Sequence, residues 1–241
     1  MDTGKSKVIA DCLRNRHLTV EQFRNLPISR DFAQNPGDID TAPPHSFLYQ
    51  CGYLTLRPGT TNHLSLDYPN TEVLNSMSKL LIQNIVSENA YDNFQNALLI
   101  ALMDKDIEKL VQVFNHLLAS IPYDDYAKAI HQNVLFYDFK FPVQEWLYRS
   151  SILSLLHGCG VEVTPEVHTN LGRADLVVVH EGVTWVIEIK VAYKGDDPAK
   201  KAEEAYRQIE DNNYAKPYSN TVCVGLAIDD AVRQITNWTV S

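Results

Sequence analysis

The sequence predicts an α/β protein in which a mixed β-sheet flanked by helices follows a mostly helical region. Two observations support this fold class. Helical periodicity, with apolar residues three and four positions apart, dominates residues 71–133. After residue 160, short apolar runs alternate with turn signals, and the run at 220–228 is almost entirely apolar, as in a strand buried on both faces. The helical part therefore precedes the sheet.

Composition limits the class of protein. The chain has 241 residues, enough for one large domain or two small ones, with 45% hydrophobic and 21% charged residues. No apolar run reaches about 18 residues, so no membrane span is expected, and the N-terminus has no secretory signal pattern. The cysteines form no CxxC pair, which favours a reducing cytoplasm and argues against zinc. They are Cys12, Cys51, Cys159 and Cys223.

The net charge of −9 is unusual for a protein held on nucleic acid by bulk electrostatics. Both halves of the chain carry a net negative charge. Any contact with DNA must therefore use a local patch or be brief, as turnover favours.

The first part of the chain reads as helices followed by a hairpin. Helices are expected at 4–16 and 18–26, the second with Thr19 as N-cap. Prolines predict a loop at 31–44. A helix end runs into a strand within 47–56, a turn follows, and 63–68 alternates as a second strand.

Helices followed by a hairpin resemble a winged-helix unit, which has two interpretations. One is DNA binding through a recognition helix. The other is a structural or protein-contact unit, which is favoured because Arg24 is the one basic residue between 18 and 26. Further helices are predicted at 71–86, 88–103, 104–120 with Asp104 as N-cap, and 122–133. A junction near 137–142 divides the chain into domains at 1–138 and 139–241.

The C-terminal part alternates strands and helices. A helix at 145–157 ends at glycines, and 161–168 is an edge-strand candidate because it contains Pro165. The next elements are strands at 175–180 and 183–191, a helix at 198–213, the strand at 220–228, and a strand or short helix at 231–240.

The turn at Glu181-Gly182 fixes the register of a hairpin. If these two residues form the loop, Asp175 lies directly opposite Glu188, with Cβ atoms about 5 Å apart. Like charges at that distance destabilise an empty sheet unless a proton or a cation lies between them. A one-residue bulge would separate the two side chains.

Lys190 lies two residues after Glu188, so both side chains share one face of the strand. The residues on the other face are apolar. Carboxylate ligands favour Mg²⁺ or Mn²⁺, and a metal-bound water is a nucleophile for phosphodiesters. This acid, acid and base cluster therefore predicts a metal-dependent phosphodiesterase.

The set Gly172-Arg173-Ala174-Asp175 with Glu188-Ile189-Lys190 resembles the signature of the PD-(D/E)XK nuclease superfamily. The proline that usually precedes the aspartate is Ala174 here. The resemblance implies a restriction-endonuclease-like fold and Mg²⁺-dependent (or Mn²⁺-dependent) cleavage of DNA by a bacterial protein. It covers about residues 139–225.

The resemblance also implies roles for individual residues. Asp175, Glu188 and the Ile189 carbonyl would bind the metal, and Lys190 would assist the attacking water. Glu145, on the preceding helix, and Gln208, on the following helix, occupy positions where the superfamily often has further active-site residues. Arg173 either contacts phosphate or caps the strand.

Within the superfamily, the chain resembles bacterial proteins that join an AAA-ATPase-like domain to this nuclease-like domain. Residues 47–55 and 66–70 resemble the end of that ATPase region. Gly4-Lys5-Ser6 lacks the upstream glycine and the apolar strand of a phosphate-binding loop, so ATP binding is not expected.

Two other functions stay open. One is a catalytically inactive nuclease fold that binds DNA or protein, which the acidic charge favours. The other is a winged-helix DNA binder whose C-terminal domain forms a homodimer. The basic residues of the helix at 198–213 either track a DNA backbone or form salt bridges on a solvent-facing surface. They are Lys200, Lys201 and Arg207, with Lys194 just before them.

Overall fold

The computed structural model of the chain describes residues 20–29, 32, 43–58, 64–86, 88–121, 143–168 and 172–241. The helices expected at 4–16 and 122–133, most of the loop at 31–44, and the junction at 137–142 lie outside these residues.

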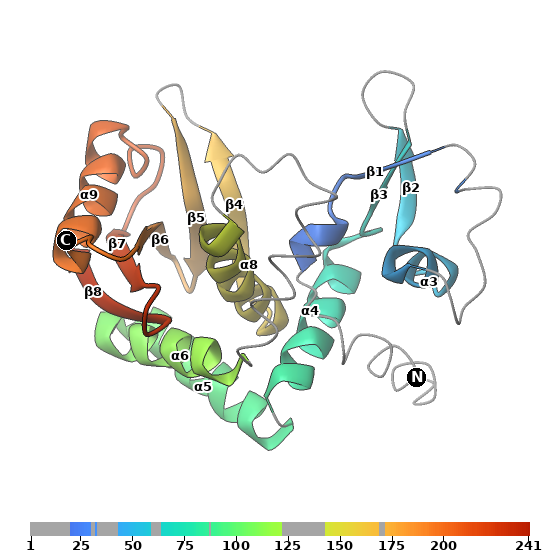
Figure 1. Ribbon diagram of the computed structural model, residues 1–241, viewed down its shortest axis with the longest axis horizontal. Coiled ribbons are helices and arrows are strands. Elements are labelled where there is room, and N and C mark those ends of the chain that lie inside the picture. Colours follow the sequence, from blue (N-terminus) through green and yellow to red (C-terminus); the bar gives the residue numbers. More distant parts are fainter. Residues whose placement is uncertain are drawn as a thin grey trace.

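A small antiparallel sheet forms the first unit, on the right of Figure 1. Its strands are β1 (Leu26–Ile28), β3 (Leu64–Asp67) and β2 (Thr55–Pro58), in that order across the sheet. Strands β2 and β3 form the predicted hairpin, and helix α3 (Pro44–Gln50) precedes it. Phe47, Leu48 and Leu66 are among the buried residues of this unit.

The helix predicted at 18–26 is wrong in its second half. The structure has a short 3₁₀ helix, η1 (Val20–Phe23), followed by strand β1. Asn25 has a positive φ of 50°, which ends the helical turn. Pro27 disfavours helical backbone at the residue before it. No recognition helix is therefore present between residues 20 and 28.

Three helices connect this unit to the large sheet. Helix α4 (Thr71–Ile85) begins at Asn70, whose side chain accepts a hydrogen bond from the Val73 N–H, and α5 (Glu88–Asp104) and α6 (Ile107–Ser120) follow. The predicted N-cap at Asp104 is wrong, because α5 extends through that residue. Asp106 caps α6 instead, accepting from the Lys109 N–H at 3.0 Å.

The C-terminal part is a five-stranded mixed sheet with the order β4-β5-β6-β7-β8. Strands β6 and β7 are parallel and the other neighbours are antiparallel. The strands are β4 (Glu162–His168), β5 (Arg173–His180), β6 (Val183–Ala192), β7 (Thr221–Asp229) and β8 (Gln234–Val240). Strand β4 lies at the edge, as Pro165 predicted, and β8 forms the other edge.

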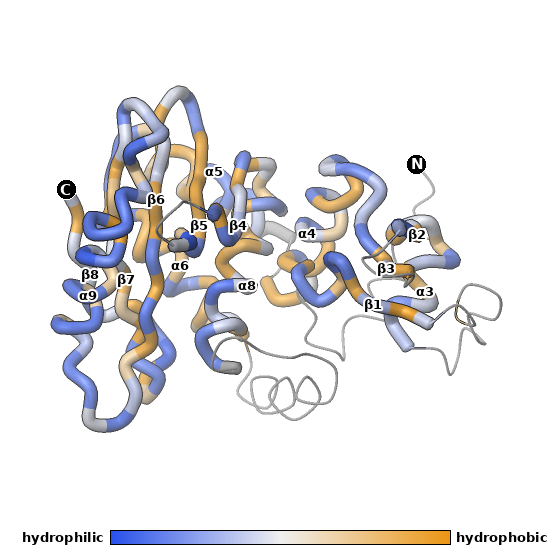
Figure 2. The backbone as a smooth tube through the Cα atoms, turned by 90° about the horizontal axis from the view of Figure 1, so that it is seen from above, coloured by the Kyte–Doolittle hydropathy of each residue, from blue (hydrophilic) through white to orange (hydrophobic). Residues whose placement is uncertain are grey.

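Helices cover both faces of this sheet (Figure 1). Helix α8 (Val143–Gly158) packs with α5 and α6 on one face, and α9 (Pro198–Asp211) lies on the other. The α/β prediction is thus confirmed. Figure 2 shows hydrophobic residues concentrated along the central strands and hydrophilic residues along α9. Helix α9 buries only Ala202, Ala205 and Ile209.

One hydrophobic core joins the sheet to the helices that precede it in the sequence. It contains Leu102 of α5 and Phe114 of α6 together with Trp185 and Ile187 of β6. The Trp185 indole N–H also donates to the Leu102 carbonyl at 3.2 Å. Division of the chain at residue 138 stays a prediction, since that boundary lies outside the described residues. No helix in the described part is long and apolar enough to cross a membrane.

Gly225 of β7 brings α9 close to the sheet. A Cβ atom at this position would lie 2.4 Å from the Ala202 carbonyl oxygen and 2.4 Å from the Tyr206 backbone nitrogen. Gly225 pairs with Glu188 on the neighbouring strand. The missing side chain therefore sets how near α9 lies to Glu188.

We expect Gly225→Ala to destabilise the protein by about 1–3 kcal/mol, because backbone atoms of α9 have to move to admit the methyl group. Urea denaturation followed by circular dichroism measures the change. Unchanged stability would contradict the close packing of α9 on β7.

Candidate active site

The hairpin of β5 and β6 has the predicted two-residue turn. Glu181 and Gly182 both have positive φ, 46° and 74°, as in the type I′ turn that matches the twist of antiparallel strands. His180 pairs with Val183, and this register continues to Leu176 and Ile187. The backbone pairing ends there, and Asp175 and Glu188 are the next residues along the two strands.

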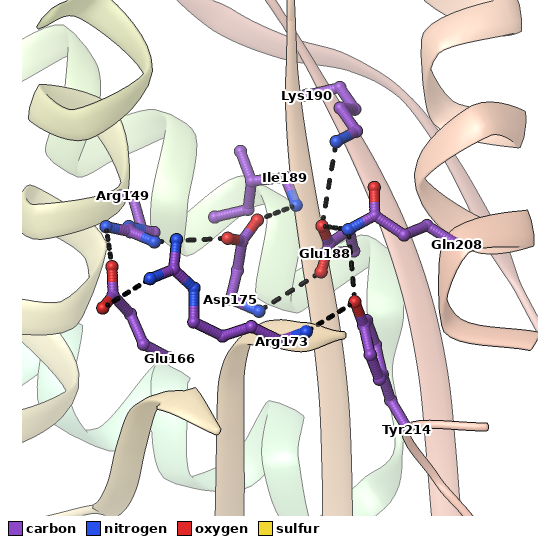
Figure 3. Close-up of polar contacts among 9 residues, drawn as sticks. All are labelled: Arg149, Glu166, Arg173, Asp175, Glu188, Ile189, Lys190, Gln208 and Tyr214. Atoms are coloured by element: carbon purple, nitrogen blue, oxygen red, sulfur yellow. Dashed lines mark hydrogen bonds and ion pairs between the residues drawn. The ribbon is translucent and has the colours of Figure 1, made fainter. Parts of the chain in front are cut away.

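At these two residues, side-chain carboxylates accept hydrogen bonds from the backbone of the neighbouring strand. The Asp175 carboxylate accepts a hydrogen bond from the Ile189 N–H at 2.9 Å, and the Glu188 carboxylate accepts from the Asp175 N–H at 3.2 Å (Figure 3). Each carboxylate thus bonds to the backbone of the opposite strand. The two acidic groups lie next to each other between β5 and β6.

The two carboxylates differ in their other partners. Asp175 also accepts from an Arg149 guanidinium N–H at 3.2 Å, on the α8 side. Glu188 accepts from the Gln208 side-chain amide, on the α9 side. The pair therefore bridges the two helical layers, whereas the sequence predicted both groups on one face of a regular hairpin.

Burial makes the charged forms of these two acids costly. Asp175 is 5% exposed and Glu188 is 2% exposed. Burial, followed by the negative charge of Asp175, raises the pKa of Glu188 to about 8. Burial also raises the pKa of Asp175, while Arg149 opposes that rise. At neutral pH the pair retains a proton unless a cation compensates its charge.

The side chains of Lys190 and Gln208 both interact with the Glu188 carboxylate. The Lys190 ammonium is 3.8 Å from Glu188 Oε1, which also accepts from the Gln208 amide. This agrees with the period-two spacing of Glu188 and Lys190. The Lys190 side chain is 28% exposed and the Glu188 side chain 2%, so the ammonium lies between the buried acids and solvent.

Glu145 occupies the first turn of α8. Burial and the negative charge of Asp175 raise its pKa, whereas the positive charges of Lys190 and Arg149 lower it. Glu145 therefore interacts electrostatically with the same cluster. Of the five residues predicted as catalytic, Asp175, Glu188, Lys190 and Gln208 are linked by hydrogen bonds and an ion pair, and their catalytic roles stay a prediction.

Three further residues of the cluster were missed by the sequence analysis. Arg149 lies four residues after Glu145, on the same side of α8, and that spacing was an available signal. Glu166 binds Arg149 at 3.0 Å and Arg173 at 3.1 Å. Tyr214 follows α9, and no pattern in the sequence around it indicated a residue of the site.

Tyr214 explains the glycine of the Gly-Arg-Ala-Asp sequence. Its hydroxyl oxygen accepts from the Arg173 backbone N–H at 2.9 Å and from the Gln208 amide at 3.5 Å. A Cβ atom on Gly172 would lie 2.5 Å from this oxygen. Glycine therefore admits the hydroxyl that ties the start of β5 to Gln208.

The solvent-facing side of α9 carries salt bridges, one of the two alternatives for its basic residues. Lys201 pairs with Glu204 at 2.9 Å and Arg207 with Glu203 at 3.6 Å. These surface pairs reduce the charge that is available to DNA.

Comparison with known proteins finds a family similar to the C-terminal part of the chain. Residues 143–238 match a family model described as PD-(D/E)XK nuclease superfamily. This part of the chain is therefore similar to that superfamily, as the sequence resemblance predicted. The matched region contains the carboxylate pair, Lys190 and Gln208, and the sheet with helices on both faces is consistent with the restriction-endonuclease-like fold.

One similar protein comes from Azotobacter chroococcum mcd 1 and carries the description "Uncharacterized protein in vnfD 5'region". The identity is 30% over 226 residues, which cover 90% of this chain and 40% of that protein. The chain thus spans less than half the length of this relative. The predicted connection to an ATPase-like domain stays a prediction.

Members of this superfamily typically use Mg²⁺ or Mn²⁺, and the residues here fit such an ion. Among the described residues, no group of three or more His, Cys, Asp or Glu side chains is arranged to hold a metal ion. Two adjacent carboxylates are enough for Mg²⁺, which usually keeps several waters and binds one or two carboxylates plus substrate phosphates. The raised pKa of Glu188, which burial and Asp175 cause, also indicates a site that favours an added cation.

The raised pKa predicts how stability depends on pH. Because burial raises the pKa of Glu188 from 4.5 to about 8, the folded protein binds this proton more tightly than the unfolded chain. Without metal, this contribution to stability is complete below about pH 4.5 and is lost as the pH rises through about 8. Glu188→Gln removes the titration, so the stability of the variant relative to the wild type should be greater at pH 8 than at pH 5 by about 1–3 kcal/mol.

Urea denaturation in the presence of EDTA measures this difference at the two pH values. Glu203→Gln, on the exposed face of α9, is the matched control and should show no pH-dependent difference. A Glu188→Gln variant whose stability relative to the wild type is equal at the two pH values would contradict the raised pKa of Glu188.

Proposed function

We propose that this chain is a nuclease that hydrolyses DNA phosphodiesters with the help of Mg²⁺ or Mn²⁺. The observation that carries the proposal is the pair of buried carboxylates between β5 and β6, with Lys190 at its solvent side. Two adjacent buried acids cost free energy unless a proton or a cation lies between them, and a divalent cation would allow both to be ionised. The match of residues 143–238 to the nuclease superfamily supports the same reaction.

Asp175 and Glu188 would hold the ion through one carboxylate oxygen each, and the Ile189 carbonyl is proposed as a further ligand. A bound divalent ion lowers the pKa of the attacking water and compensates the charge of the phosphate. Gln208 keeps the Glu188 carboxylate in place through its amide N–H. Tyr214 in turn limits the movement of Gln208.

Lys190 would act on the water and on the phosphate. Its ammonium group is held near the carboxylates by Glu188, where it can orient the water and stabilise the negative charge that develops on the phosphate. Glu145 approaches from α8 and would support the metal through water. The reaction breaks the bond between phosphorus and the leaving oxygen, and water supplies the hydroxyl group and the proton of the two products.

DNA is proposed as the substrate, contacted through a local patch because the net charge is −9. Cytoplasmic location, a bacterial source, a homodimer and the absence of ATP binding remain predictions from the sequence.

A second function is a nuclease fold that binds DNA or protein without catalysis. One observation favours it: the Asp175 oxygens already have partners in Arg149 and the Ile189 N–H, at 3.2 and 2.9 Å. In such a protein, Arg149 would be the permanent counter-ion of the acidic pair.

Cleavage of DNA tests the proposal directly. Purified protein with Mg²⁺ or Mn²⁺ should cut plasmid or single-stranded DNA, and EDTA should abolish the activity. Lys190→Ala should reduce the rate at least about 100-fold, since it removes a charge that stabilises the transition state. Lys200→Ala, an exposed lysine on α9, is the matched control and should cleave at the wild-type rate.

Equal cleavage by the wild type and Lys190→Ala would rule out this mechanism. If the wild type does not cleave, calorimetry with Mn²⁺ separates the two functions. Binding that is lost in Asp175→Asn supports a metal site whose substrate was not supplied, whereas no binding in the wild type supports the non-catalytic protein.

A further inference from the structure

Two arginines contact one glutamate next to the carboxylate pair (Figure 3). Glu166 Oε1 accepts from Arg149 Nη2 at 3.0 Å, and Glu166 Oε2 accepts from Arg173 Nη1 at 3.1 Å. Arg149 also reaches Asp175 through its other terminal nitrogen, at 3.2 Å. Two guanidinium groups that face one anion resemble the way arginines bind a phosphate.

Glu166 has an unusual backbone. Its φ is 52°, and it lies between two ladder pairs of β4 and β5 without pairing itself. A non-glycine residue in this conformation costs about 1–3 kcal/mol, and such residues cluster at functional sites. The Glu166 side chain is 36% exposed, whereas the Arg149 side chain is 9% exposed. Glu166 is therefore the member of this group that can move outward, and Arg149 is the fixed one.

This inference rests on the proposed function. We propose that Arg149 and Arg173 form the subsite that binds a DNA phosphate beside the reacting phosphodiester, and that the Glu166 carboxylate occupies this subsite until DNA displaces it. The location fits, because Arg149 joins the subsite directly to Asp175. Arg173 is two residues before Asp175 on the same strand.

The charges of the group suggest an order of binding. Arg149 and Arg173 carry two positive charges, which Glu166 and Asp175 balance. When Asp175 binds a divalent ion, its ion pair with Arg149 becomes weaker. The subsite then carries a net positive charge, and an incoming phosphate can replace Glu166. DNA should therefore bind more tightly when the divalent ion is present.

Fluorescence anisotropy with a labelled DNA duplex tests the subsite, with Ca²⁺ in place of Mg²⁺ as an oxygen-binding divalent ion. Arg173→Gln and Arg149→Gln should each weaken binding about 10-fold, the usual loss for a hydrogen-bonded arginine–phosphate contact. Glu166→Gln should tighten binding about 3-fold or more, because the competing anion is gone. Arg207→Gln, with 71% of the side chain exposed on α9, is the matched control and should change the affinity less than about 2-fold.

Arg149 is buried, so its replacement by Gln can unfold the protein, which a melting curve reveals. Arg149→Lys keeps the charge without the forked geometry and should weaken binding by an intermediate factor. Wild-type affinity in folded Arg173→Gln and Arg149→Lys would overturn the proposal. Weaker binding by Glu166→Gln would overturn the displacement step, since Glu166 would then only hold the arginines in place.

Calorimetry with Mn²⁺ in the absence of DNA separates this inference from the proposed function. Wild-type protein that binds no Mn²⁺ contradicts the proposed metal site. Normal Mn²⁺ binding together with unchanged DNA affinities in the arginine variants contradicts the arginine subsite alone.

Discussion

The site depends on two hydrogen bonds that cross between β5 and β6. Asp175 accepts from the backbone of β6, and Glu188 accepts from the backbone of β5. The backbone pairing of β5 with β6 ends at Leu176 and Ile187, and these side-chain bonds continue the link between the two strands. Burial, and after it the negative charge of Asp175, raises the pKa of Glu188 to about 8. A bound cation would stabilise the ionised forms of both carboxyl groups.

The surrounding layers hold this pair from opposite sides. Helix α8 supplies Arg149 to Asp175, and α9 supplies Gln208 to Glu188. Close approach of α9 requires Gly225, and the contact of Tyr214 with the start of β5 requires Gly172. The geometry of the acids is therefore linked to the packing of both helical layers.

Most of the sheet and the centre of the site could be predicted from the sequence, because local rules determine them. A two-residue turn with glycine fixes the register, and the period of two places Lys190 beside Glu188. Arg149, Glu166 and Tyr214 depend on how helices and the edge strand pack, which no local pattern reports. In the N-terminal part, the helix predicted at 18–26 failed because Asn25 and Pro27 end the turn and start a strand.

A crystal structure of the protein soaked in Mn²⁺ is the most direct test of the central claim. We expect an anomalous scattering peak within bonding distance of one oxygen each of Asp175 and Glu188, with Arg149 turned away from Asp175 toward Glu166. A structure in which no peak appears and Arg149 still pairs with Asp175 would contradict it.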